Sequence, residues 1–154
     1  MNIGEHLWVG VGSSTGIIDI NNGGILNVSG ILGLGTVDAV NPSGGLGFLN
    51  INDGGLFNLN NIHSLGTSIQ TGSLLNISGS GVMTLPGDFT GVINNYVAAG
   101  QIVGNGVPDQ VQAIFDSGLN KTLVTAVAVP EPTNFALAAF AGLALVLRRI
   151  VRKS

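Results

Sequence analysis

The chain has 154 residues, enough for one domain, and only 8% of them are charged. The first 129 residues carry a single cation, Lys121, against seven carboxylates. A domain with one lysine and no arginine cannot neutralise nucleic-acid phosphates, so nucleic acid is excluded as a partner. Cysteine is absent, so the chain forms no disulfide.

The first eight residues contain no basic segment, no apolar stretch of export length and no small-residue cleavage site. They therefore do not form a secretory signal peptide. Glycine, at 25 residues, is about twice as frequent as in an average protein. Because 45% of the residues are hydrophobic, this glycine content indicates many tight turns rather than disorder.

Three similar units follow one another at residues 18–28, 49–59 and 75–85. Each has an apolar residue, Asp or Asn, then Ile, followed by four positions that end in glycine. Two apolar residues, a small polar residue and an apolar residue complete the unit. The units start 31 and 26 residues apart, which is typical of stacked β-solenoid coils with loops of unequal length.

Apolar and polar residues alternate within each unit, which is the period of a β-strand. The glycines and the neighbouring Asn and Asp residues suit the turns between strands. If the coils stack, the first and third residues of the units form two interior columns. These columns are Ile18, Leu49 and Leu75, and Ile20, Ile51 and Ile77. We therefore expect an all-β fold, a short right-handed β-solenoid of about three coils over residues 1–85.

The pattern changes after residue 85. A short helix is predicted between Gly91 and Gly100, with Thr90 as its N-cap, because apolar residues recur on one helical face. Those apolar residues are Val92, Ile93, Tyr96 and Val97. An open solenoid end exposes unpaired backbone, so we expect this helix to cap the stack. Two strands at residues 111–115 and 122–127 are predicted to form a terminal hairpin, which completes a capping region at residues 86–128.

The repeats offer little chemistry for catalysis or metal binding. A glycosidase needs two carboxylates about 5–9.5 Å apart, but Asp19 and Asp53 occupy non-equivalent positions of their units. A lyase acting on an anionic sugar needs a cationic base, and Lys121 lies in a turn after the repeats. His6 and His63 lie in separate strand-like segments without a paired histidine. We therefore expect no catalytic activity, no metal site and no cofactor.

The last 25 residues contain three elements in a fixed order. Pro130 and Pro132 keep the chain around Glu131 extended. An uncharged apolar run follows: Phe135, Ala136, Leu137, Ala138, Ala139, Phe140, Ala141, Gly142, Leu143, Ala144, Leu145, Val146 and Leu147. Four cations come next: Arg148, Arg149, Arg152 and Lys153. With its flanking residues, the run approaches the length needed to span a bilayer, and the cations would keep the C-terminus cytoplasmic. We therefore predict a single transmembrane helix with a basic stop.

These features resemble the PEP-CTERM sorting signal of Gram-negative envelope proteins, which has Pro-Glu-Pro, a transmembrane helix often containing Gly-Leu, and an Arg-rich end. The resemblance covers residues 129–154, with Gly142 and Leu143 as the Gly-Leu pair. It implies export by the Sec machinery, transient anchoring in the inner membrane, and processing by an exosortase that recognises Pro130, Glu131 and Pro132. The mature protein would then reach the cell surface or the extracellular polysaccharide matrix.

A sorting signal of this kind works only with an export signal. We therefore expect an N-terminally truncated fragment or a misplaced start codon, with upstream coils and a signal peptide missing. The function that the resemblance implies is structural or adhesive, with the chain as substrate of the exosortase and extracellular polysaccharide as a candidate contact. Two alternatives remain open. One is a fragment of a carbohydrate-active β-helix enzyme. The other is an autotransporter-like adhesin passenger, although autotransporters end in an outer-membrane barrel rather than a single helix.

Overall fold

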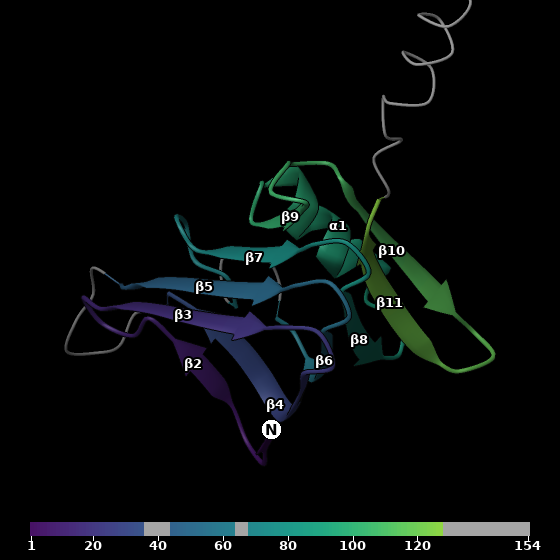
Figure 1. Cartoon of the computed structure of the whole chain (residues 1–154), viewed down its shortest axis with the longest axis horizontal. Helices are drawn as coiled ribbons and strands as arrows, with labels where there is room; N and C mark the ends of the chain where they lie inside the picture. The colour runs from purple at the N-terminus through teal and green to yellow at the C-terminus, as the bar shows by residue number, and fades with distance from the viewer. Residues whose placement is uncertain (36–43, 64–67, 128–154) are drawn as a thin grey trace, which may run out of the picture.

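The computed structural model describes residues 1–35, 44–63 and 68–127. In this part the chain forms a β-solenoid of about three coils with one short helix (Figure 1), so the predicted all-β solenoid is confirmed. Its elements are β1 (Asn2–Ile3), β2 (Leu7–Val9), β3 (Thr15–Ile20), β4 (Ile25–Leu34), β5 (Leu46–Ile51), β6 (Leu56–Asn61), β7 (Leu74–Ile77), β8 (Val82–Pro86), α1 (Thr90–Ala98), β9 (Ile102–Gly104), β10 (Val111–Asp116) and β11 (Lys121–Ala126).

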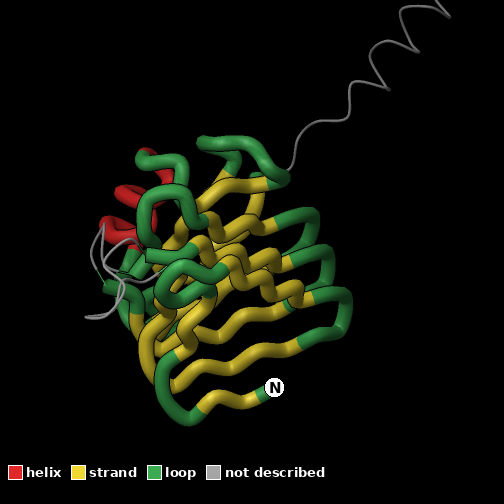
Figure 2. Tube along the Cα trace, turned by 90° about the vertical axis from the view of Figure 1, so that its left-hand side faces the viewer, coloured by secondary structure: helices red, strands yellow, loops and turns green. Residues whose placement is uncertain are grey.

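The strands stack coil upon coil (Figure 2). One sheet has the order β3-β5-β7-β9, and all its strands are parallel. The other has the order β1-β4-β6-β8-β11-β10, parallel up to β8 and antiparallel beyond it. The register between β4 and β6 shifts between Val28 and Ile31. Beyond this shift, Leu32, Gly33 and Leu34 of β4 pair with β2. Each coil therefore contributes one strand to each sheet, as the repeats require.

The register of the first sheet confirms the two predicted interior columns. Ile18 pairs with Leu49 and Leu49 with Leu75, while Ile20, Ile51 and Ile77 align in the same way. Five of these six side chains are buried: Ile20, Leu49, Ile51, Leu75 and Ile77. Ile18 is half-buried and packs against the core. The second sheet supplies a matching column of Leu26, Phe57 and Met83.

Helix α1 confirms the predicted capping helix. Ile93 and Tyr96 are buried, and Val92 and Val97 pack against the core. Gly100 follows the C-cap residue Ala99, and its φ of 69° lies in the left-handed region, which glycine adopts at little cost. The amides of Gly100 and Gln101 donate to the carbonyls of Val97 and Tyr96, both at 2.9 Å, which satisfies the last turn.

The predicted N-cap is wrong. Phe89 takes the capping position, without a side-chain hydrogen bond to the helix, and Thr90 is the first helical residue. The Asp88 carboxylate accepts hydrogen bonds from the amide of Thr90 at 3.0 Å and from its hydroxyl at 2.6 Å. These bonds lower the pKa of Asp88, because they favour its charged form. Asp88 therefore satisfies the amide of Thr90 itself, which is the first amide of the helix and has no partner within it.

The predicted terminal hairpin is confirmed as β10 and β11. Its second strand also pairs antiparallel with β8, so the hairpin extends the second sheet beyond the last coil. Strand β9 was not predicted. It pairs with β7 and returns the chain to the first sheet after the helix. Within the described ranges no helix is long and apolar enough to cross a bilayer, and the predicted span from Phe135 to Leu147 lies outside them.

Candidate functional site

The predicted sorting motif, Pro130, Glu131 and Pro132, and the basic residues after the predicted span lie outside the described residues. The described chain ends at Val127, beside the cap. The amide of Val127 donates to the carbonyl of Gln110 at 2.8 Å, and its carbonyl accepts a bond from the Asn105 side chain at 3.2 Å. The chain therefore leaves the solenoid at the capped end (Figure 1).

A ladder of polar side chains crosses the outer face of the second sheet. The Asn27 amide donates to Asn2 at 2.6 Å, the Asn58 amide donates to Asn27 at 2.7 Å, and the Thr84 hydroxyl donates to Asn58 at 2.7 Å. Each residue thus donates to the coil before it. Such amide ladders stabilise stacked parallel strands, because each coil satisfies the polar groups of the next.

A groove of about 310 Å³ runs along this ladder, and we call it the amide groove. Its lining residues are Asn27, Val28, Ser29, Asn58, Leu59, Asn60, Thr84, Pro86 and Lys121. The side chains that reach solvent there are mainly amides and hydroxyls, with one ammonium group. Amides and hydroxyls both donate and accept hydrogen bonds, which suits contact with a hydroxyl-rich surface. None of the described residues that line the groove is a carboxylate.

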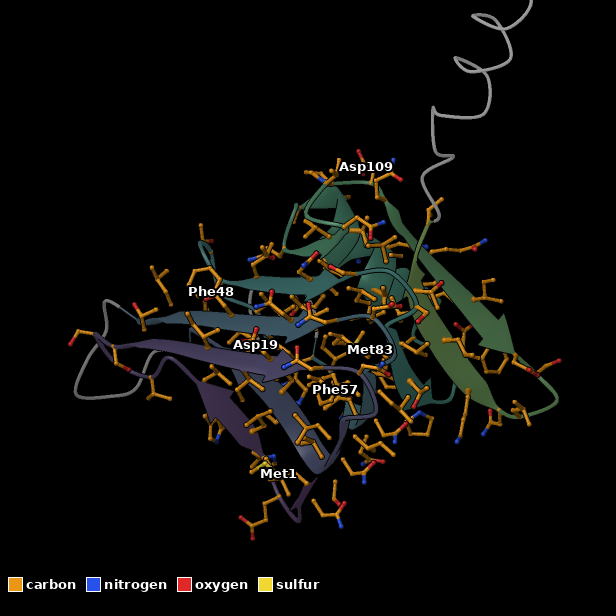
Figure 3. The ribbon with its side chains drawn as sticks, viewed as in Figure 1. Met1, Asp19, Phe48, Phe57, Met83 and Asp109 are labelled. Atoms are coloured by element: carbon orange, nitrogen blue, oxygen red, sulfur yellow. The ribbon has the colours of Figure 1, made fainter. Side chains whose placement is uncertain are left out.

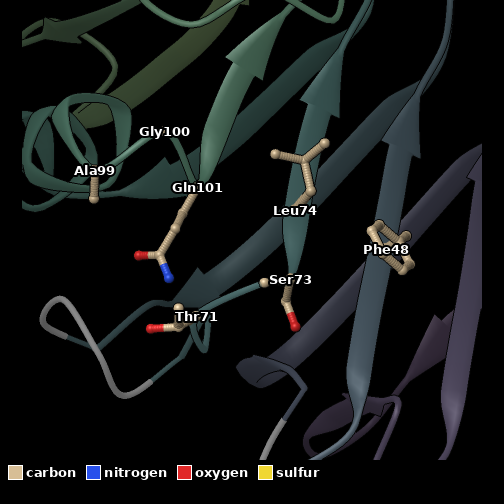
Figure 4. A pocket seen from close by; sticks show the side chains of 8 residues that line it. Phe48, Thr71, Ser73, Leu74, Ala99, Gly100 and Gln101 are labelled. Atoms are coloured by element: carbon tan, nitrogen blue, oxygen red, sulfur yellow. The ribbon is translucent and has the colours of Figure 1, made fainter.

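A second groove, of about 420 Å³, lies between the outer face of the first sheet and the end of α1 (Figure 4). Phe48 and Leu74 form its apolar part. Its buried polar groups already have partners within the protein. The Ser73 hydroxyl accepts a bond from the amide of Gly47 at 3.0 Å, and the Gln101 side chain donates to the carbonyl of Ile69 at 3.0 Å. These groups hold loops in place, and we assign no ligand to this groove.

The two aspartates considered for catalysis lie in different parts of the coil. Asp19 is exposed on β3 and accepts a hydrogen bond from the Asn50 side chain of the next coil at 2.7 Å (Figure 3). Asp53 lies in a turn and accepts bonds from the hydroxyl and the amide of Ser80 in the next coil. These bonds lower the pKa of Asp53, whereas a catalytic acid needs a raised one.

The Asp53–Ser80 contact predicts a pH dependence of stability. Because its folded pKa is lowered, Asp53 contributes its full stabilisation above its unfolded pKa of about 3.9. This contribution is lost as the pH falls through the lower folded value. We expect the melting temperature of the wild type to exceed that of Asp53→Asn at pH 7 and the two to converge by about pH 2. A difference that stays constant across this range would contradict the assignment.

The histidines and the tryptophan do not form a site with these aspartates. The His6 ring accepts a hydrogen bond from the amide of Ile31 at 3.1 Å and lies 5.7 Å from the Trp8 ring. His63 contributes backbone groups, since its carbonyl accepts the Tyr96 hydroxyl at 3.1 Å. In the part of the chain that the structure describes, no three His, Asp or Glu side chains gather where they could hold a metal ion. The expected lack of a metal site and of catalysis stays a prediction.

The amide groove was not predicted from the sequence, although a signal for it exists. Asn27, Asn58 and Thr84 occupy the tenth position of their respective repeat units. A polar residue that recurs at one repeat position predicts a polar column on the outside of the stack. Lys121 carries no such signal, because it reaches the groove through the pairing of β11 with β8.

No family model matches the chain, and comparisons with curated proteins and with solved structures found no match.

Proposed function

We propose that this chain is a non-enzymatic structural or adhesive protein of the bacterial envelope that is sorted by a PEP-CTERM/exosortase system. The observation that carries the proposal is the order of elements in the tail. The tripeptide Pro130-Glu131-Pro132 precedes an uncharged apolar run, and four cations within six residues follow the run. The apolar run is the membrane span, and the basic end stays in the cytoplasm.

In this proposal the chain is exported by the Sec machinery, anchored transiently in the inner membrane, cut by the exosortase and released to the cell surface or the extracellular matrix. Residues 1–85 are the repeat domain, residues 86–128 its cap and residues 129–154 the sorting signal. The coil is right-handed, as parallel strands joined by crossovers almost always are. The departure of the chain at the capped end supports this arrangement, because the tail then tethers the solenoid without interrupting its stack.

The described surface supports a binding or structural role rather than catalysis. The amide groove presents donors and acceptors that suit a hydroxyl-rich polysaccharide. Asp19 and Asp53 are each engaged by a polar side chain of the following coil. They therefore contribute to the stacking of the coils, which favours the structural role over the carbohydrate-active enzyme.

The sorting signal can be tested with two substitutions in the recognition tripeptide. The chain is expressed behind a working signal peptide in a host that carries an exosortase. The wild type is expected to lose its basic end and leave the inner membrane. Pro130→Ala combined with Glu131→Ala is expected to remain in the inner membrane at full length, because the enforced extended conformation and the displayed carboxylate are lost. Immunoblotting of membrane and released fractions measures both outcomes.

A matched control changes the two residues next to the tripeptide, Thr133→Ala with Asn134→Ala, and should be processed like the wild type. Replacing Arg148, Arg149, Arg152 and Lys153 with Gln should act differently, since it weakens the stop and the orientation of the span. Cleavage and release of the tripeptide variant at the wild-type level would show that the tail is only an anchor.

A further inference from the structure

The amide groove crosses the strands of the second sheet and so runs along the axis of the stack, in which the coils lie one upon another (Figure 2). One wall consists of Asn27, Asn58 and Thr84, which lie opposite one another on β4, β6 and β8. The other wall consists of Ser29, Asn60, Pro86 and Lys121. Residues two apart on a strand lie on the same face, so each of the three coils adds one residue to each wall.

The ladder on the first wall leaves part of its hydrogen-bonding capacity unused. A side-chain amide has two N–H donors and an oxygen with two lone pairs. Asn27 and Asn58 each use one N–H and one lone pair in the ladder. Both residues therefore keep one donor and one acceptor for a ligand, and the Thr84 hydroxyl, which donates its proton to Asn58, still accepts.

The second wall contributes polar groups that the fold does not use. Ser29, Asn60 and Lys121 are exposed, and within the described ranges no hydrogen bond or ion pair engages their side chains. The groove beside α1 differs in this respect, because its Ser73 and Gln101 side chains hold loops in place. The amide groove thus has donors and acceptors on both sides that are available to a ligand.

The spacing of these groups is regular. Adjacent strands lie about 4.8 Å apart, so the three steps from β4 to β11 cover about 14 Å. One ring of an extended, β-linked sugar chain has about the length of one such step. A chain that lies along the groove therefore presents one ring to each coil, with its hydroxyl groups facing the two walls.

The charges around the groove disfavour an acidic polysaccharide. Lys121 is the only lysine or arginine among residues 1–129, which carry seven carboxylates. Asp116 of β10 lies directly opposite Lys121, so a neighbouring carboxylate partly offsets the ammonium charge. A polymer with a carboxylate on every ring would be repelled by such a domain, whereas a neutral polymer would not.

We propose that the amide groove binds a neutral, extended polysaccharide that lies along the stack with one sugar ring per coil. This inference rests on the proposed function, a structural or adhesive role at the cell surface or in the matrix, and it names the ligand. Ser29 and Lys121 hold the two ends of the bound stretch, and Asn60 holds its middle. Because the groove is open to solvent at the surface of the sheet, a long polymer binds without needing a free chain end.

Short sugar chains test the site. The probe is cellotetraose, a neutral chain of β-1,4-linked glucose, and the protein is the full chain in micelles of a detergent without a sugar headgroup. Binding is measured by isothermal titration calorimetry. Cellotetraose is expected to bind more tightly than cellobiose, because four rings reach from Ser29 to Lys121 and two do not. The acidic counterpart, a tetramer of β-1,4-linked glucuronic acid, is expected to bind more weakly than cellotetraose at low salt.

Two substitutions locate the ligand without disturbing the ladder. Ser29→Ala and Asn60→Ala each remove one hydrogen-bonding group that has no partner in the described ranges. Each is expected to weaken cellotetraose binding roughly 2- to 10-fold, the effect of one neutral hydrogen bond. The matched control is Asn94→Ala with Ser117→Ala, since both residues are exposed but line no part of the groove. The control should bind like the wild type.

No binding of cellotetraose by the wild type would overturn the inference, as would equal losses in the groove variants and the control. Cellobiose that binds as tightly as cellotetraose would contradict the placement of one ring per coil. Tighter binding of the glucuronate tetramer would contradict the neutral class. These results are independent of the sorting signal: a chain that is processed and released but binds no sugar refutes the groove alone, and groove-dependent binding without processing refutes the sorting signal alone.

Discussion

Replacing Phe57 by alanine is expected to lower the free energy of unfolding by about 3–5 kcal/mol, the usual range for a fully buried phenylalanine. Phe57 is 0% exposed and lies between Leu26 and Met83 in the central column of the second sheet (Figure 3). The coils above and below hold the strand in place, so the structure cannot close around the cavity. A domain of this size is stable by about 5–15 kcal/mol, so one such cavity removes a large share.

Phe48 gives a matched control for this prediction, because it is the same residue type on the neighbouring sheet. Its side chain points to the outer face and is only half-buried. Phe48→Ala should therefore cost about 1 kcal/mol, the ordinary effect of a partly exposed substitution. Denaturant unfolding followed by circular dichroism measures both variants. Equal losses for Phe57→Ala and Phe48→Ala would contradict the inside–outside assignment of the two positions.

The interior of the solenoid could be predicted because the repeat itself encodes it. Alternation within a unit assigns one face of each strand, and equal repeat positions assign the columns, so Leu49, Ile51, Leu75 and Ile77 were placed correctly. Ile18 is half-buried, although it shares its column with the buried Leu49 and Leu75. The repeat gives the column in which a side chain lies but not how deeply the side chain is buried.

The elements outside the repeat were harder to predict. Strand β9 has three residues, Ile102–Gly104, which are too few for an alternation of apolar and polar residues to be visible. The strand conformation there depends on the pairing with β7. The helix was predicted from its apolar face, but the role of the Tyr96 hydroxyl was not. This hydroxyl accepts a bond from the amide of Ser68 at 3.1 Å and donates to the carbonyl of His63. Contacts of this kind depend on which segments the fold brings together.

The candidate site likewise has one part that the repeat predicts and one part that depends on long-range pairing. The amide ladder follows from repeat positions, but the groove beside it also needs Lys121, which an antiparallel pairing with Pro86 brings there. Such long-range pairing leaves no local signal in the sequence. The sorting motif is the opposite case, since its order of elements is local and readable, and its function stays a prediction that the processing experiment tests.

Replacing Gly47 by alanine is expected to cost about 3 kcal/mol or more, because the new Cβ would meet backbone on several sides. It would lie 2.7 Å from the amide nitrogen of Gly35, 2.8 Å from the Cα atom of Leu34, and in contact with the carbonyl oxygen of Val9. That carbonyl also accepts the amide of Gly35 at 2.8 Å, so it cannot move aside without breaking a hydrogen bond. Gly47 therefore allows β5 to pass close to the strands behind it.

Gly91→Ala is the control, because nothing lies within 4 Å of its Cβ position and Gly91 is in α1. Alanine has a higher helix propensity than glycine, so the free energy of unfolding of this variant should rise by about 0.5–1 kcal/mol. Thermal and denaturant unfolding of the two variants should therefore move in opposite directions from the wild type. If Gly47→Ala unfolds like the wild type, the close approach of β5 to β2 and β4 is wrong. Such a result would mean that there is space for a methyl group between Gly47 and the backbone of Val9, Leu34 and Gly35.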